Sequence, residues 1–169
     1  TTGPNSTILR SVLGSPNPTY TATLINSFTY KKWTFGFQLD RVAGAEVFNA
    51  DFRTRQGVGN GSEFAQREHK GEIPRGYISG IYGIEEWRVD DGSFTKLREL
   101  SVGYAFGKVS NLFSSLTVTL TGRNLISWDN CRGYDPETNS TGQSSLFRGV
   151  DFGNVPIPKT FQFGVVANF

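Results

Sequence analysis

The sequence predicts an all-β protein whose five long antiparallel strands form part of a transmembrane β-barrel. Three observations lead to this fold class. Apolar and polar residues alternate with a period of two in five separate segments, as they do in strands that have one apolar face. The expected strands are about 9–11 residues long, which is enough to cross a bilayer when tilted. Long and short connections also alternate along the chain, which is the layout of outer-membrane barrels.

The composition agrees with a turn-rich β-protein and excludes several other classes. The 169 residues include 14 Phe, 6 Tyr, 3 Trp and 20 Gly, and no Met. The formal net charge is only +2, so there is no electrostatic case for nucleic-acid binding. The single cysteine, Cys131, excludes an internal disulfide framework and a multi-cysteine metal site. No apolar run approaches the roughly 20 residues of a transmembrane helix.

The alternation places the strands at residues 20–30, 33–42, 93–106, 115–127 and 159–169. The first strand is the least regular, because Asn26 interrupts its apolar face. The last is the most regular, and its apolar face carries Phe161, Phe163, Val165 and Phe169. An Arg or Lys at mid-depth on a lipid-facing surface costs about 2–4 kcal/mol. None of the five apolar sets contains one, as a lipid-facing surface requires.

The connections differ in length and composition. Lys31 and Lys32 alone join the first two strands, which predicts a hairpin. Residues 107–115 join the third and fourth strands. The segments 42–92 and 128–159 are long and rich in Gly, Asn, Ser, Asp and Pro, which indicates loops without secondary structure. Long loops of this kind in compact domains are usually functional when ordered.

Aromatic residues lie near the strand ends, as the interfacial girdles of a membrane barrel require. They are Tyr20, Tyr30, Trp33, Phe106, Trp128, Phe161 and Phe169. Soluble antiparallel sheets also alternate apolar and polar residues, so two alternatives stay open. One is a soluble secreted β-sandwich that binds carbohydrate through loop aromatics. The other is a structural or adhesive barrel to which several chains each donate a few strands.

Six motifs, in order and over nearly the whole chain, resemble those of the SusC/RagA-type TonB-dependent outer-membrane transporters. The longest is DGSFTKLRELSVGY, the family's "DGSF-KLR-L-LGY" strand, at residues 91–104. The others are GSPNP at 14–18, NSFTYK at 26–31, TGRNL at 121–125, GYDPE at 133–137 and PIPKTF at 156–161. Arg123 departs from the pattern, because the family usually has Gln there.

The resemblance implies more about fold and function than the residues alone predict. It implies a barrel of about 22 strands with a plug in its lumen, of which residues 1–169 are the C-terminal five strands. The plug and the remaining barrel then lie outside this chain. The implied function is active import of glycan oligomers or peptides, not an enzymatic reaction. The implied partners are a SusD-like surface lipoprotein acting as a lid, the TonB complex through the N-terminal part, and the barrel-assembly machinery.

A periplasmic carboxyl terminus fixes the expected topology. The Lys31–Lys32 turn and residues 107–115 then lie in the periplasm, and the long loops lie outside the cell, in line with the short-turn, long-loop rule. Residues 1–19 become the end of a preceding extracellular loop. The terminal strand, with Phe161, Phe163, Val165 and Phe169, is the segment that the assembly machinery of such proteins recognises.

The two faces of the strands have different expected roles. The apolar face meets the lipid bilayer, and the polar face lines the lumen, where it contacts the plug or the passing solute. The lumen-facing set is Gln38, Asp40, Glu99, Thr119, Thr121 and Arg123. Four loop aromatics are candidates for stacking on a sugar ring or holding a peptide: Trp87, Trp128, Tyr134 and Phe147. The alternative for each is that it packs under its own loop.

No catalytic constellation is present in the sequence. His69 is the only histidine and lies in a charged run, with nothing that marks a nucleophile beside it. No cofactor is expected. Loop carboxylates could bind Ca²⁺, which prefers oxygen ligands, although their spacing matches no known calcium loop. These carboxylates are Asp129, Asp135, Glu137 and Asp151.

Overall fold

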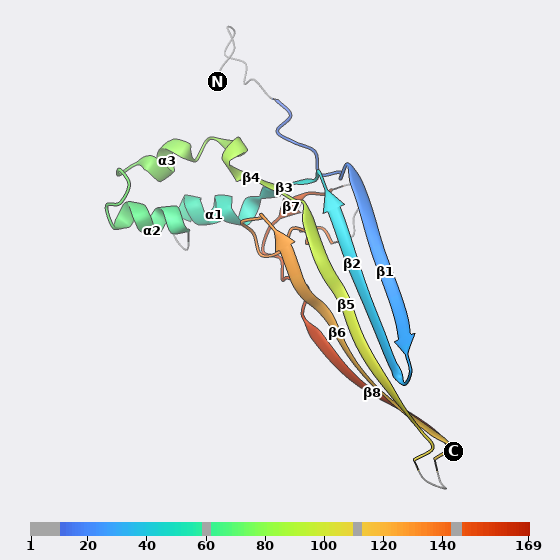
Figure 1. The fold of residues 1–169 in the computed structure, drawn as a ribbon. Helices are drawn as coiled ribbons and strands as arrows, with labels where there is room; N and C mark the ends of the chain where they lie inside the picture. The colour runs from blue at the N-terminus through green and yellow to red at the C-terminus, as the bar shows by residue number, and fades with distance from the viewer. Residues whose placement is uncertain (1–10, 59–61, 110–112, 143–146) are drawn as a thin grey trace.

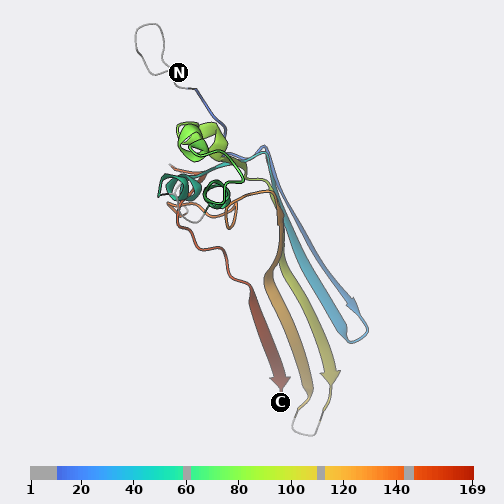
Figure 2. The ribbon, with the colours of Figure 1, turned by 90° about the vertical axis from the view of Figure 1, so that its left-hand side faces the viewer.

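The protein consists of a long, curved sheet with a smaller helical region at one end (Figures 1 and 2). This computed structural model describes residues 11–58, 62–109, 113–142 and 147–169. Residues 1–10 of the expected N-terminal loop segment therefore lie outside the described residues, as does part of the connection at residues 107–115.

The sheet contains five strands in the order β1-β2-β5-β6-β8, and every neighbouring pair is antiparallel. The strands are β1 (Tyr20–Tyr30), β2 (Trp33–Ala43), β5 (Phe94–Gly107), β6 (Ser115–Asp129) and β8 (Thr160–Asn168). They contain 11, 11, 14, 15 and 9 residues. The predicted five-stranded antiparallel sheet is confirmed.

Short connections and the carboxyl terminus gather at one end of the sheet, and the long connections gather at the other (Figure 1). The hairpin between β1 and β2 closes directly, with Tyr30 opposite Trp33. Lys31 takes a positive φ of 55°, because a two-residue hairpin loop requires the left-handed region to match the twist of its strands. The alternation of long and short connections in the sequence is therefore an arrangement in space.

Near the helical end, irregularities in β5 and β6 fix the position of the last strand. The pairing shifts register between Leu97 and Glu99. Asn124 in β6 has a positive φ of 53°, a conformation that Asn tolerates better than most residues. Its side-chain amide donates to the Pro158 carbonyl at 3.3 Å. The TGRNL and PIPKTF motifs are thereby joined at the point where the chain enters β8.

The segment between β2 and β5 is not a structureless loop, so that expectation is wrong. It contains β3 (Glu46–Asn49), α1 (Ala50–Val58), α2 (Glu63–His69), α3 (Tyr77–Ile81), the 3₁₀ helix η1 (Glu85–Arg88) and β4 (Val89–Asp91). The second long connection contributes β7 (Val150–Asp151). A small sheet in the order β4-β3-β7 forms the base of this region. We call residues 44–93 the helical insertion.

Helix caps explain why this polar sequence is helical. The Asn49 side chain accepts from the Phe52 backbone N–H at 2.8 Å, and the Ser62 hydroxyl accepts from the Ala65 N–H at 3.1 Å. Asn and Ser are strongly preferred at such N-terminal positions. Ion pairs at i,i+4 spacing add to the first two helices, Asp51 with Arg55 in α1 and Glu63 with Arg67 in α2. Local signals therefore outweigh the loop-like composition.

The packed core lies in and beside the helical insertion, not along the sheet. Its buried apolar residues are Ala43, Ala45, Val47, Ile78 and Phe94. Gly92, in the DGSF motif, allows the close approach of β3, because a Cβ there would come within 2.8 Å of the Val47 side chain. Among the described residues, no helix combines the length and apolarity needed to cross a bilayer.

Candidate functional site

One face of the five-stranded sheet is a continuous apolar surface. The register places Phe35 opposite Phe28 and Val102, and Leu120 opposite Val102 and Phe163. Because side chains alternate between faces, residues aligned in this way point to the same side. The apolar sets predicted separately for each strand therefore combine into one surface that extends from β1 to β8.

This apolar face is exposed to an unusual degree. Phe161 and Phe163 are each 72% exposed, and Leu24 and Leu120 are each 55% exposed. Contiguous apolar patches beyond a few hundred Å² are rare on soluble monomers and mark contact with a membrane or a partner. No second sheet among the described residues packs on this face, although a β-sandwich would require one.

Aromatic side chains form a band at the turn end of the apolar face. The Phe28 and Phe35 ring centroids are 5.1 Å apart, and Trp33 lies 6.0 Å from Phe35 and 4.7 Å from Tyr104. Tyr104 in turn lies 4.7 Å from Phe106. Amphipathic rings at this level are typical of the water–lipid boundary of membrane barrels.

The sheet also has two open edges. In the described residues, β1 pairs only with β2, and β8 pairs only with β6. Each outer strand therefore presents a row of unpaired backbone N–H and C=O groups. In a bilayer such groups must be satisfied by further strands, because no water reaches them. The geometry of the sheet is that of a barrel segment.

The six residues predicted to face a lumen share the opposite, polar face. Gln38 and Asp40 alternate with the apolar residues of β2, and Glu99 lies opposite both Gln38 and Arg123. The Arg123 guanidinium forms a 2.9 Å ion pair with the Glu99 carboxylate. Thr119 and Thr121 continue this face on β6, opposite Gly103 and Ser101. Their orientation toward a lumen stays a prediction.

A network of ion pairs, which we call the loop latch, joins the polar face to the loop after β6. The Lys96 ammonium lies 2.6 Å from an Asp135 oxygen and 2.9 Å from a Glu137 oxygen. Arg98 bridges Glu137 at 2.5 Å and Asp40 at 2.7 Å. Lys96 is only 4% exposed. The KLR and GYDPE motifs thus supply the two halves of one structural contact.

Glu137 is ionised in this network. Burial raises the pKa of its carboxyl, but hydrogen bonds from Arg98 and Lys96 outweigh the burial, so the pKa lies below its usual value. Asp135 adds backbone contacts, because its oxygens accept from the N–H groups of Glu137 at 3.0 Å and Ile157 at 3.4 Å. The latch therefore fixes the start and the end of the last long connection above β5.

The four candidate ligand aromatics lie at separate places. Trp87 packs inside the helical insertion, with its ring centroid 5.5 Å from Phe64 and the Arg132 guanidinium 5.9 Å from its ring. Trp128 is exposed at the end of β6, opposite Thr95. Trp87 therefore matches the alternative considered from the sequence, in which the aromatic side chain packs beneath its own loop.

Tyr134 and Phe147 are both exposed, at different positions of the last long connection. The Tyr134 hydroxyl accepts from Arg55 at 3.0 Å. Tyr134 also lines a cavity of about 380 Å³ together with Asp51, Asp151 and others. The carbonyl of Phe147 accepts from Asn139 and Thr141, both at 2.7 Å. The structure does not bring the four aromatics into one site, and ligand contact by any of them stays a prediction.

Two arginines, one buried and one exposed, are important residues that the sequence did not reveal. Arg88 is fully buried, and its guanidinium donates to the Gln56 oxygen at 3.2 Å and the Tyr82 carbonyl at 2.5 Å. Arg132 donates to Asp90 at 2.5 Å and to the Trp87 carbonyl at 2.6 Å. Neither residue lies in a recognisable motif. The contacts of Arg88 with Gln56 and of Arg132 with Asp90 join segments far apart in the chain.

The loop carboxylates that were considered for Ca²⁺ serve other contacts or stand apart. Asp135 and Glu137 belong to the loop latch, and Asp129 accepts from Ser127 at 2.5 Å. Burial and the nearby Asp51 raise the pKa of the Asp151 carboxyl. Within the described ranges, no cluster of three or more His, Cys, Asp or Glu residues could hold a metal ion. Burial raises the pKa of the Cys131 thiol to about 11.

The chain is similar in sequence to TonB-dependent receptors. A TonB-dependent receptor of Formosa agariphila is 29% identical over 175 residues, which cover 94% of this chain and 18% of the receptor. A second TonB-dependent receptor of the same organism is 26% identical over 182 residues, 99% of this chain and 18% of the receptor. The chain therefore spans about a fifth of the length of these relatives. No family model matches the chain.

Solved structures of the RagAB peptide importer share the fold. The open-open state aligns with a TM-score of 0.67 at 18% identity, over 92% of this chain and 18% of that one. The closed-closed state aligns with a TM-score of 0.66 at 15% identity, over all of this chain and 20% of that one. The resemblance to TonB-dependent transporters of the SusC/RagA type, drawn from the motifs, is confirmed. These similar proteins are receptors and importers, which transport their ligands and are not enzymes.

Proposed function

We propose that this chain is part of an outer-membrane active importer that takes up glycan oligomers or peptides. The observation that carries the proposal is the apolar face of five long strands, exposed along its length and open at both edges. In a barrel wall, lipid chains would cover this apolar surface, because strands of about 9–11 residues span the hydrocarbon when tilted. The resemblance to TonB-dependent receptors and to a peptide importer supports import as the role.

Residues 1–169 then form the last five strands of a barrel of about 22 strands. The polar face, with Gln38, Asp40, Glu99, Thr119, Thr121 and Arg123, contacts the plug or the solute. The apolar terminal strand, with Phe161, Phe163, Val165 and Phe169, is the signal for the barrel-assembly machinery. Energy reaches the importer from the TonB complex through the N-terminal part of the whole protein.

The helical end of the molecule is the side proposed to face the cell exterior. It carries the long connections, and outer-membrane barrels place their longer loops outside. A SusD-like lipoprotein lid would meet this end, where Trp128, Tyr134 and Phe147 are exposed. These aromatics then offer ring faces to the incoming oligomer or to the lid, whereas Trp87 packs against Phe64 within the insertion.

An intact-mass measurement and peptide map of the native protein, extracted from outer membranes, test the assignment. The proposal expects these 169 residues within a chain several times longer that contains a plug. Uptake of labelled oligosaccharides and peptides by cells with and without the gene, before and after collapse of the proton gradient, tests active import. A soluble native species of 169 residues would contradict the proposal and favour a secreted carbohydrate-binding domain.

A further inference from the structure

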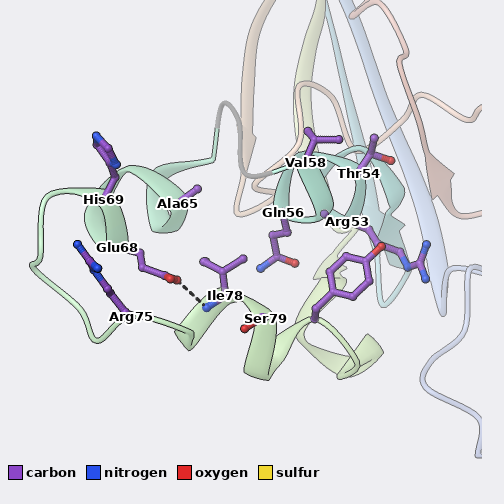
Figure 3. Close-up of a pocket in the computed structure, with 12 residues that line it drawn as sticks. Arg53, Thr54, Gln56, Val58, Ala65, Glu68, His69, Arg75, Ile78 and Ser79 are labelled. Carbon is purple, nitrogen blue, oxygen red and sulfur yellow. Dashed lines mark hydrogen bonds between the residues drawn. The ribbon is translucent and has the colours of Figure 1, made fainter.

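A cavity in the helical insertion and a groove on the sheet are both large enough for a ligand, but they differ in charge. The cavity, of about 1050 Å³, opens between α1, α2 and α3, and Gln56 and Ile78 line it (Figure 3). The Glu68 carboxylate points into it and accepts from two backbone N–H groups, whereas Arg75 and His69 point away from it (Figure 3). This arrangement does not select a ligand by its charge.

The groove lies on the apolar face at the turn end of the sheet and has a volume of about 730 Å³. One side of it consists of large rings, because Trp33, Tyr104 and Phe106 pack edge to face along β2 and β5. The other side consists of the smaller Val118 and Leu120 of β6, which lie opposite Tyr104 and Val102 in the register. A trough of aliphatic side chains beside a wall of rings has the shape and the apolarity that an acyl chain requires.

The charged side chains described at this end of the sheet are all lysines. The strand halves and turns around the groove are residues 26–36, 101–109, 113–119 and 163–169. They contain Lys31, Lys32 and Lys108, and no Arg, Asp or Glu. None of the three lysines forms an ion pair in the part of the chain that the structure describes. The apolar groove therefore borders on a surface of purely positive side chains.

Two of these lysines lie next to the groove. Lys32 directly precedes Trp33, and its carbonyl accepts from the Ala105 N–H at 2.8 Å, which places it beside β5 at the level of the rings. Lys108 follows Phe106 by two residues. Lysine stems cover apolar surface while their ammonium groups stay in water. Both ammonium groups are therefore within reach of the head group of a lipid whose chain lies in the groove.

We propose that the groove and the two lysines beside it bind an anionic phospholipid of the periplasmic leaflet. An acyl chain lies along Val118 and Leu120 against the rings, and the phosphate meets the Lys32 and Lys108 ammonium groups. Charge complementarity selects the anionic lipid, because basic clusters at a membrane surface attract anionic head groups and this end carries no described acidic side chain. The choice of leaflet rests on the proposed function, which places the turn end in the periplasm.

Native mass spectrometry of the purified full-length protein in detergent, titrated with lipids, tests this site. Two probes are phosphatidylglycerol and phosphatidylcholine with identical acyl chains, and the third is glycerol 3-phosphate, an anionic head group without a chain. The wild type should bind phosphatidylglycerol about tenfold or more tightly than phosphatidylcholine, since each lysine near an anionic head group contributes about fivefold, or about 1 kcal/mol. Glycerol 3-phosphate at the same concentration should not displace the bound lipid, because it leaves the groove empty.

Matched variants separate the lysines from the groove. Lys32→Gln and Lys108→Gln should each lower the affinity for phosphatidylglycerol about fivefold and change that for phosphatidylcholine less than about twofold. Lys159→Gln removes an exposed lysine just before β8, at the other end of the sheet, and should change neither. Leu120→Trp fills part of the groove and should weaken both lipids. Leu24→Trp should weaken neither, because Leu24 is equally exposed on the apolar face, at 55%, but does not line the groove.

Three results would overturn the lipid site. They are equal affinity of the wild type for the two lipids, an equal effect of Lys159→Gln and the two variants beside the groove, and displacement of the lipid by glycerol 3-phosphate. The uptake assay separates this inference from the proposed function. A preference for phosphatidylglycerol that depends on Lys32 and Lys108, in a protein that imports nothing, would refute import and keep the site. Import by a protein that binds both lipids equally would do the reverse.

Discussion

The five-stranded sheet and the helical insertion differ in which side chains they expose and which they bury. In the sheet, large apolar side chains such as Phe161 and Phe163 are mostly exposed. In the insertion, the charged side chains of Arg88 and Asp90 are buried, as is Lys96 at the end of β5 that meets the adjoining loop. Buried charges are tolerated only when paired, and these three are paired. The difference teaches that the two regions suit different surroundings, and the proposed barrel wall supplies them, with hydrocarbon around the sheet and water around the insertion.

Loss of the buried cation of the loop latch should have the largest effect. Lys96→Met leaves Asp135, which is 6% exposed, without its cation, and breaking a buried ion pair costs about 3–5 kcal/mol. Hydrogen exchange of backbone amides at residues 133–142 and 147–157 in the full-length protein should become faster, with the strands unchanged. Arg53→Gln removes the exposed pair with Glu85 and should cost no more than about 1 kcal/mol. Equal effects of the two variants would show that the latch does not hold the loop.

Neighbouring residues on opposite faces of β6 test the assignment of the two faces. Leu120→Arg places a cation on the apolar face and should destabilise the barrel by about 2–4 kcal/mol at mid-depth. Thr119→Arg places the same cation on the polar face and should cost much less. The comparison is read from urea unfolding in lipid vesicles and from the yield of folded protein in outer membranes. An equal loss for both variants would mean that the apolar face does not meet lipid.

Acidification should weaken the loop latch before it affects the sheet. The pKa of the Glu137 carboxyl is lowered in the folded state by Arg98 and Lys96. Its stabilisation is therefore complete above the ordinary pKa of a glutamate, about 4.3, and is lost as the pH falls through the lowered value. Proteolysis of the last long connection, followed from pH 7 to pH 3, should accelerate at the acidic end. In Glu137→Gln the connection should be cleaved faster at pH 7 and respond less to acid, and an unchanged pH profile would exclude Glu137 as the titrating group.

The smallest expected effect concerns the hairpin at the turn end of the sheet. Lys31 has a positive φ, which costs a residue with a side chain about 1–2 kcal/mol. Glycine removes that cost but brings a larger loss of chain entropy, about 0.5–1 kcal/mol. Lys31→Gly should therefore raise stability by about 1 kcal/mol or less in urea unfolding, with Lys32→Gly as the matched control. A clear destabilisation by Lys31→Gly alone would contradict the assigned turn geometry.

The sheet could be predicted from the sequence because its signal repeats every second residue. Phe161, Phe163 and Val165 identify their strand and face without knowledge of any partner. The helices of the insertion have weaker signals, and the caps at Asn49 and Ser62 could have revealed them. The loop latch and the cavity could not be predicted, because Lys96 meets Asp135, and Gln56 meets Arg88, only after distant segments have folded together.

The central claim is that the sheet spans an outer membrane, with the helical insertion outside the cell and the hairpin in the periplasm. Labelling of intact cells with a membrane-impermeant maleimide tests it directly, with Cys131→Ser as the background. Lys70→Cys in the C-cap of α2 should react in intact cells. Lys32→Cys in the hairpin should react only after the outer membrane is permeabilised. Reaction of both positions in intact cells, or of Lys32→Cys alone, would contradict the account.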